Sequence, residues 1–291
     1  MPRSYRLRLG LAAAASLAGC AVAPPEPPTC PSDAEVAAKV QAFVALQPLA
    51  DSAPGLTMEG AACGARKFVA GLQATQGKVV GYKAGLTTAA VQQRFGVNAP
   101  IRGVLLEKML LKDGAEVPAK YGVRPFAEPD LVVEVGSSAI HDAKTPAEVL
   151  ANLRAVIPFI ELPDLLVADM SKVQGPTIAA NNIGARLGVL GTPIPARTDA
   201  AFADALQKMT VKASDATGKE LSSAPGAAIL GHPLNAVIWL AADLKKDGIT
   251  LKPGDLLSLG AFGNLPVAAG QSIRVVYDGL PANPVVQVRF R

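Results

Sequence analysis

Two acidic residues, Glu128 and Asp130, lie two positions apart in the segment Arg124–Val135 (R-P-F-A-E-P-D-L-V-V-E-V), which continues as an apolar, β-branched run. Alternate residues of an extended strand point to the same face, so we expect the two carboxylates side by side where the strand enters a core. Such carboxylates repel each other and lose solvation, and a hard cation such as Mg²⁺ would relieve both costs. The alternative is a surface turn at Pro129 in which both acids face water.

A third acid, Glu161, stands in the apolar segment I-P-F-I-E-L-P (Ile157–Pro163). A glutamate between large apolar residues is rarely buried without a partner. We therefore predict that Glu128, Asp130 and Glu161 converge on one metal ion.

Lys83 lies among small residues in K-V-V-G-Y-K-A-G-L (Lys78–Leu86), which we predict to be a strand. Its ammonium group could face an anionic ligand, or it could extend outward into solvent.

Helical periodicity is clearest near the amino terminus and in the segment G-H-P-L-N-A-V-I-W-L-A-A-D-L-K-K-D-G. Residues 32–46 and 58–73 predict two helices that form a small amino-terminal helical region, the first with Ser32 and Glu35 as a capping box. Residues 233–246 predict a third helix that Gly248 terminates.

Glu161 must be brought back to Glu128 and Asp130 by the chain between them. Thr145 with Glu148 predicts a helix start, and the apolar spacing carries this helix to Val156. We expect residues 159–162 to return as a strand. The short strands and turns near the carboxy terminus predict antiparallel β-structure.

Two further polar residues stand out by their positions in the sequence. Asn181 lies in the apolar segment 176–190, and His232 directly precedes the helix at 233–246. Capping or packing is the alternative role for His232.

Composition and missing motifs exclude several functions. The 291 residues are 50% hydrophobic and only 4% aromatic, with 27 Gly and 24 Pro, which suits short elements joined by tight turns. No basic stripe with interleaved aromatic residues is present, so we expect no nucleic-acid partner. The sequence has no P-loop, dinucleotide fingerprint, C-x-x-C pair or H-E-x-x-H, and its two histidines with no G-x-S-x-G give little support for a serine hydrolase.

The first residues have the pattern of an export signal, with Arg3, Arg6 and Arg8 before a short apolar run. The sequence L-A-G-C, ending at Cys20, resembles the lipobox of bacterial lipoproteins. That resemblance implies a signal peptide over 1–19, acylation of Cys20 and a periplasmic, lipid-anchored protein, with Ala21 favouring the outer membrane. Residues 20–31 are Pro-rich and would form a tether. The alternative is an ordinary cleaved signal in which Cys20 is incidental.

Cys30 and Cys63 are the remaining cysteines. In an oxidising periplasm we expect them to form a disulfide. Two free buried thiols are the alternative.

Five motifs together resemble the 2-keto-4-pentenoate hydratases of the fumarylacetoacetase superfamily: G-Y-K-A-G-L-T, R-F-G-V-N-A-P, the acidic strand, I-E-L-P and L-G-H-P-L-N-A-V-I-W-L-A. The similarity covers Val79 to the carboxy terminus. It implies an α+β fold, a mixed, mainly β roll over residues 78–291 behind a helical region at 32–77, and commonly a homo-oligomer. L-G-A-F-G (Leu259–Gly263) matches a late glycine-containing strand of the family.

The resemblance also implies roles for named residues. Glu128, Asp130 and Glu161 fall on ligands of Mg²⁺ or Mn²⁺, and Lys83 falls on an active-site lysine. Asn181, His232 and Gly260 fall near the pocket, and Asn181 and His232 join Lys83 as candidate catalytic residues. The implied activity is a hydratase or lyase that acts on a small 2-oxo (2-hydroxydienoate) acid.

Two features depart from the family pattern, one at Asp130 and one in the segment Asn98–Gly103. Asp130 stands where a second glutamate is usual, and Ile101 and Arg102 stand where hydratases commonly carry acidic residues. A binding protein with altered specificity on the same scaffold therefore remains an alternative, as does an envelope structural lipoprotein with solvated acids.

Overall fold

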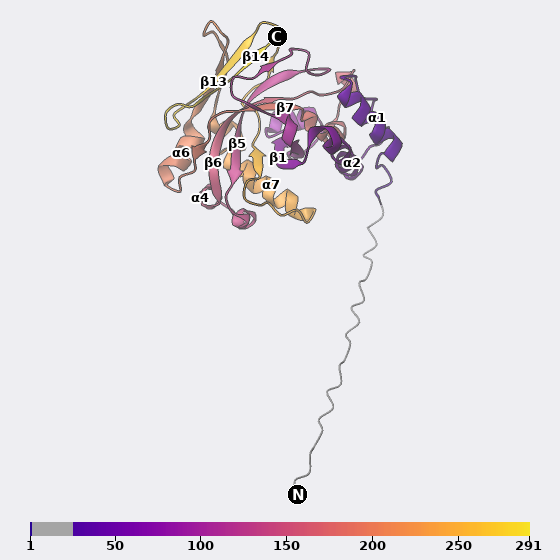
Figure 1. Cartoon of the computed structure of the whole chain (residues 1–291), viewed down its shortest axis with the longest axis horizontal. Helices are drawn as coiled ribbons and strands as arrows, with labels where there is room; N and C mark the ends of the chain where they lie inside the picture. The colour runs from indigo at the N-terminus through magenta and orange to yellow at the C-terminus, as the bar shows by residue number, and fades with distance from the viewer. Residues whose placement is uncertain (2–25) are drawn as a thin grey trace.

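The computed structural model describes residue 1 and residues 26–291 (Figure 1). The signal segment 1–19, Cys20 and the first part of the tether lie outside the described residues, except Met1. The helices are α1 (Asp33–Val44), α2 (Met58–Gln76), α3 (Ala89–Arg94), α4 (Pro146–Leu150), α5 (Gly175–Ala180), α6 (Ala200–Lys208) and α7 (Leu234–Lys246). Among the described residues, no helix has the length and apolar character needed to cross a membrane.

The strands form two sheets. They are β1 (Val79–Gly85), β2 (Ile101–Leu106), β3 (Leu110–Lys112), β4 (Glu116–Val117), β5 (Phe126–Val135), β6 (Leu153–Leu162), β7 (Leu187–Leu190), β8 (Ile194–Pro195), β9 (Thr210–Ser214), β10 (Glu220–Pro225), β11 (Leu256–Ser258), β12 (Leu265–Pro266), β13 (Ser272–Asp278) and β14 (Val285–Phe290).

The larger sheet has nine strands in the order β2-β1-β11-β5-β6-β7-β3, with β12 paired to β5 and β8 paired to β6. The smaller sheet has the order β10-β9-β13-β14-β4. Parallel and antiparallel pairs both occur, since β1 runs parallel to β11 and antiparallel to β2. The fold is therefore α+β with a mixed, mainly β architecture.

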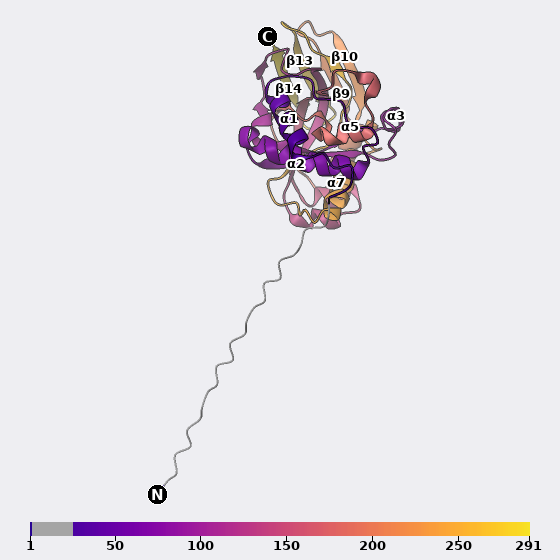
Figure 2. The same ribbon diagram turned by 90° about the vertical axis from the view of Figure 1, so that its right-hand side faces the viewer.

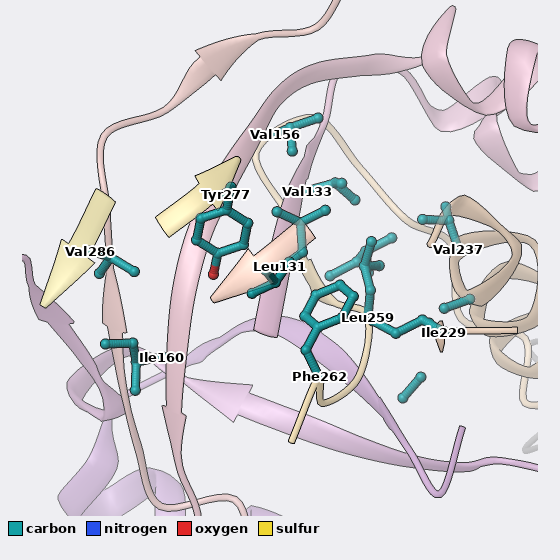
Figure 3. Packing of buried hydrophobic residues seen from close by; sticks show 14 of the residues in the cluster. Leu131, Val133, Val156, Ile160, Ile229, Val237, Leu259, Phe262, Tyr277 and Val286 are labelled. Atoms are coloured by element: carbon teal, nitrogen blue, oxygen red, sulfur yellow. The ribbon is translucent and has the colours of Figure 1, made fainter. Parts of the chain in front are cut away.

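The main core lies on one face of β5 and β6. Leu131 and Val133 of β5 and Ile160 of β6 pack there with Tyr277 of β13 and Val237 of α7 (Figure 3). Since alternate residues of a strand point to opposite faces, Glu128 and Asp130 are on the other face. That other face carries the candidate site.

The amino-terminal helices pack against the edge of the large sheet (Figures 1 and 2). Ser32 and Glu35 form the predicted capping box of α1. Phe43 of α1 and Phe68 of α2 meet edge to face, with ring centroids 5.9 Å apart. They share a cluster with Leu106 and Met109, so helices and roll bury one apolar surface together.

A disulfide joins Cys30 to Cys63, with an S–S distance of 2.03 Å. It connects the segment before α1 to the buried side of α2.

The predicted helix from Thr145 to Val156 is wrong beyond its first turns. Thr145 caps α4 with Glu148 as expected, but α4 ends at Leu150 and β6 begins at Leu153. Pro158 does not interrupt the sheet. At this residue the neighbour of β6 changes from β8 to β7, so the missing N–H of proline removes no hydrogen bond between strands.

The carboxy-terminal strands are antiparallel only in part. β13 pairs antiparallel with β14 and β9, as expected. In contrast, β11 inserts between β1 and β5 of the large sheet, parallel to the first.

Candidate active site

Two neighbouring strands, β5 and β6, bring the predicted acids together. Glu128 on β5 lies directly opposite Glu161 on β6, and Asp130 lies opposite Phe159. Residues that face each other across a ladder project from the same side of the sheet, so all three carboxylates share one face. Asp130 and Glu161 are buried, and Glu128 is partly exposed.

Asp130 is held by three donors. Its Oδ1 accepts the N–H of Leu131 and the N–H of Gly260 at 3.0 Å, and its Oδ2 accepts the Ser258 hydroxyl at 2.6 Å. Gly260 has φ +121°, and a Cβ there would lie 2.5 Å from the Thr87 hydroxyl oxygen, so this position requires glycine. Ser258 was not among the predicted site residues, although a serine within the apolar run D-L-L-S-L-G was a usable signal.

Lys83 lies on the same face as the acids. It is only 3% exposed, and its Nζ donates to Glu161 Oε1 and to the Ile183 carbonyl at 3.3 Å. Lys83 is paired in register with Ser258 on β11 and with Gly103 on β2. A Cβ at residue 103 would lie 2.9 Å from Lys83 Cγ. Glycine at this position therefore leaves the space that the Lys83 side chain occupies.

The Ile183 carbonyl is presented by an unusual stretch of backbone. Asn182, Ile183 and Gly184 have φ values of 53°, 48° and 62°, the left-handed region that β-branched residues rarely adopt. The Asn182 side chain fixes this turn by accepting the Val104 N–H at 2.7 Å and donating to the Val104 carbonyl at 2.9 Å. Backbone strain of this kind is concentrated at functional sites.

The acids carry more negative charge than Lys83 offsets. Burial raises the pKa of Glu128 to about 8, and the negative charge of Glu161 adds to this shift. Burial and Glu161 likewise raise the pKa of Asp130 to about 7, against the lowering effect of Ser258. Both shifts therefore oppose ionisation of these two carboxyl groups in the folded protein.

This donor set fits a hard divalent cation. Carboxylate oxygens are the preferred ligands of Mg²⁺ and Mn²⁺. The oxygens of the three acids do not all lie within 4.8 Å of one another in the described residues, because Glu161 is ion-paired with Lys83 instead. The structure shows Glu161 paired with Lys83, and its role as a metal ligand stays a prediction.

Asn181 lies beside this cluster but contacts a different residue. Its Oδ1 accepts Lys39 Nζ from α1 at 3.0 Å. Burial lowers the pKa of Lys39, and nearby Glu35 opposes that shift. The amino-terminal helix thus reaches the segment that ends at Ile183, a contact that no sequence signal indicated.

His232 has the alternative, capping role. Its Nδ1 accepts the Leu234 N–H at 3.1 Å where α7 begins, and its Nε2 donates to the Ala203 carbonyl at 3.1 Å. Both ring nitrogens are therefore used by the backbone, and no contact among the described residues links His232 to Lys83. A catalytic role for His232 stays a prediction.

The departure at Ile101 and Arg102 has a structural counterpart. Ile101 lies two residues from Gly103 on the same side of β2, and it packs with Ile178 and Ile183. Arg102 points to the opposite side and pairs with Asp243 of α7 and with Asp247, which directly follows that helix. An apolar wall thus stands beside Lys83.

The fold places Lys83 and three acids on one face of a mixed β roll, an arrangement that predicts a metal-dependent enzyme class. Comparison with known proteins narrows this class. The TodF product hydratase of Pseudomonas putida is 32% identical over 204 residues, 70% of this chain and 74% of that protein. The 2-hydroxyhexa-2,4-dienoate hydratase of Comamonas testosteroni is 31% identical over 81% of this chain and 88% of that protein.

A 2-keto-4-pentenoate hydratase of Paraburkholderia xenovorans is 34% identical over 64% of this chain and 67% of that protein. The chain belongs to the 2-keto-4-pentenoate hydratase family. No family model matches the sequence.

Solved structures agree with the fold. The 4-oxalocrotonate decarboxylase of Pseudomonas putida G7, complexed with magnesium and adipate, has a TM-score of 0.78 at 25% identity and covers 89% of this chain and 97% of its own. A fumarylpyruvate hydrolase of Pseudomonas aeruginosa, in complex with Mn²⁺ and pyruvate, has a TM-score of 0.51 at 15% identity, covering 72% of this chain and 89% of its own.

Proposed function

We propose that this protein is a hydratase that uses Mg²⁺ or Mn²⁺ to add water to a small 2-hydroxydienoate, the enol form of a 2-oxo acid. The observation that carries this proposal is the buried Lys83–Glu161 pair beside Glu128 and Asp130 on one face of the sheet. The family relatives named as hydratases support it.

Each residue has a defined task. Glu128, Asp130 and Glu161 would hold the cation, and Ser258 with the Gly260 N–H fixes the orientation of Asp130. A bound cation would supply positive charge for the carboxylate and 2-oxo oxygens of the substrate. Lys83 Nζ would hold or deliver a proton where negative charge develops, within a site that excludes bulk water.

Titration calorimetry tests the metal site. We expect the domain that begins after Cys20 to bind Mg²⁺ and Mn²⁺, and then oxalate only when metal is present. Glu128→Gln should weaken metal binding, because one anionic ligand becomes neutral. The matched control is Glu134→Gln, which changes the same strand at an acid paired with Arg154.

Turnover of 2-hydroxypenta-2,4-dienoate tests the reaction. A folded protein that binds no metal would contradict the whole proposal. Metal-dependent oxalate binding without turnover would instead favour a binding protein.

A decarboxylase is a second candidate because Ile101 places an apolar wall, rather than an acid, beside Lys83. Loss of CO₂ from a 2-oxo acid with a second carboxylate needs no water to be activated. Release of CO₂ from 4-oxalocrotonate, without hydration of the dienoate, would establish this reaction.

We further infer that the protein is exported and anchored through Cys20 to the outer membrane, on the support of the L-A-G-C motif. In a Gram-negative host, we expect the full chain in the membrane fraction and labelled by a palmitate analogue. Cys20→Ala should abolish the label. Equal labelling of both proteins would overturn the anchor.

A homo-oligomer remains part of the proposal. Sedimentation of the soluble domain would measure its assembly state.

A further inference from the structure

Two buried tyrosine hydroxyls connect β5 to β6 on either side of the acid pair. Glu128 lies opposite Glu161 in the ladder, and Asp130 lies opposite Phe159 two residues further along. Tyr277 and Tyr121 are 0% and 5% exposed, and their hydroxyls reach backbone carbonyls of β5.

The Tyr277 hydroxyl lies where Asp130 of β5 is paired with Phe159 of β6. Its hydroxyl accepts the Phe159 N–H at 2.9 Å and lies within hydrogen-bonding distance of the Phe159 carbonyl, also at 2.9 Å, and of the Asp130 carbonyl. The phenol thus links the two strands at the backbone of a predicted ligand. Figure 3 shows the ring among Leu131, Val133 and other core residues, on the face opposite the acids.

The directions of the backbone carbonyls along β5 show where the Tyr277 hydroxyl lies. The carbonyls of Pro129 and Leu131 accept N–H groups from Phe262 and Leu259, on the side of β11. Because carbonyls alternate in direction along a strand, the Asp130 carbonyl faces β6. The hydroxyl therefore lies in the seam between β5 and β6.

Tyr121 acts at the other end of the acid pair. Its hydroxyl donates to the Phe126 carbonyl on β5 and lies 3.2 Å from the Pro163 carbonyl, just beyond β6. The Phe126 N–H bonds to the Pro163 carbonyl, but Pro163 has no N–H to return. The Tyr121 hydroxyl supplies that missing donor.

Both rings are fixed by the smaller sheet. Tyr277 belongs to β13, and Tyr121 stacks on Phe290 of β14 with centroids 6.4 Å apart. The smaller sheet thereby determines how β5 and β6 are spaced on both sides of the Glu128–Glu161 pair.

We propose that Tyr121 and Tyr277 are positioning residues that set the separation of β5 and β6 and so the geometry of the three acids. This inference rests on the proposed metal site. Residues that orient metal ligands typically change metal affinity about 10–100-fold when they are mutated. Neither tyrosine contacts an acid side chain in the structure, so the effect would pass through the backbone.

The test uses Tyr277→Phe and Tyr121→Phe, which remove only the hydroxyls. Tyr82→Phe is the matched control, because the Tyr82 hydroxyl bonds to no other described residue. Calorimetry at a temperature well below unfolding gives Mg²⁺ and Ca²⁺ affinities. In the same samples without metal, hydrogen exchange is measured by mass spectrometry over residues 126–131 and 157–163.

We expect each hydroxyl deletion to weaken Mg²⁺ binding about 10-fold or more, with a smaller loss for Ca²⁺. Mg²⁺ requires near-ideal octahedral ligands, whereas Ca²⁺ tolerates longer, irregular ones. Exchange should quicken in both segments, and the control should match the wild type. A merely structural role would lower thermal stability and leave the ratio of Mg²⁺ to Ca²⁺ affinity unchanged, which would overturn the proposal.

Failure of the proposed function has a different signature. If the wild-type protein binds neither ion, the metal site is refuted, and hydrogen exchange alone decides the role of the hydroxyls. Unchanged exchange in both variants would then refute the positioning role as well.

Discussion

At the scale of single residues, the site depends on a lysine that is buried because an acid neutralises it. A buried ammonium group without a partner would cost several kcal/mol, and Glu161 supplies the partner for Lys83. Burial, and then the negative charge of Glu161, raise the pKa values of the neighbouring Glu128 and Asp130. Lys83 is thus both a structural counter-ion and the proton-carrying group of the proposed reaction.

Lys83→Met tests the second role. We expect turnover to fall by about 10²–10⁴-fold, the usual size of a general acid–base contribution, while metal binding persists through the three acids. Steady-state kinetics and calorimetry on the same sample measure both quantities.

Lys78→Met is the control, since Lys78 is exposed one residue before β1 begins. Retained turnover in Lys83→Met would contradict the proton-carrying role.

At the scale of elements, α7 shows how a residue with a plausible chemical role can be structural instead. His232 accepts the first free N–H of this helix and reaches back to α6. Burial lowers the pKa of His232, and the bond to the Ala203 carbonyl opposes this shift. The neutral ring is therefore the form that the folded protein favours.

The lowered pKa of His232 decides how its contribution to stability changes with pH. As the pH falls, His232 of the unfolded chain takes up a proton near the usual pKa of 6.5, whereas His232 of the folded chain does so only at a lower pH. The contribution of His232 to stability is complete above that pH and is lost as the pH falls below it.

His232→Asn should remove this part of the pH dependence. Asparagine also accepts N–H groups at helix starts, so we expect stability at pH 8 to change by no more than about 1 kcal/mol. Urea unfolding between pH 8 and 5 measures the difference, and His141, the other histidine, is present in both proteins. An unchanged pH profile, or loss of turnover with an intact fold, would contradict the capping role.

At the scale of the whole molecule, the amino-terminal helices are part of the folded unit. Their apolar cluster includes residues of the roll, and Arg186 joins the two parts by stacking on Phe43 and donating to the Phe43 carbonyl at 3.1 Å. The Cys30–Cys63 disulfide closes a loop of 33 residues around α1. This bond stabilises the protein mainly by restricting the unfolded chain.

Replacing both cysteines with serine should lower the free energy of unfolding by about 2–4 kcal/mol. Urea unfolding measures this value, and the wild-type protein treated with reducing agent should match the variant. No effect of the reducing agent on the wild-type protein would show that the disulfide contributes nothing.

Much of this protein is determined by its sequence through local interactions. The capping boxes of Ser32 with Glu35 and of Thr145 with Glu148 form as expected, because donor and acceptor are three residues apart. The spacing of Glu128 and Asp130 places both on one face of a strand for the same local reason. The family itself could be identified from motifs in the chain.

Tertiary structure decided the rest, because the choice of strand neighbours depends on residues far apart in the chain. Residues 153–157 leave a helical pattern to pair with β5, where Val156 faces Val133 and Ile157 faces Val132. Long-range pairing likewise inserts β11 beside Asp130 and brings the Ser258 hydroxyl to it. The pairs of Lys83 with Glu161 and of Tyr277 with the β5–β6 seam join residues 78 and 118 positions apart, a separation at which sequence periodicity carries no signal.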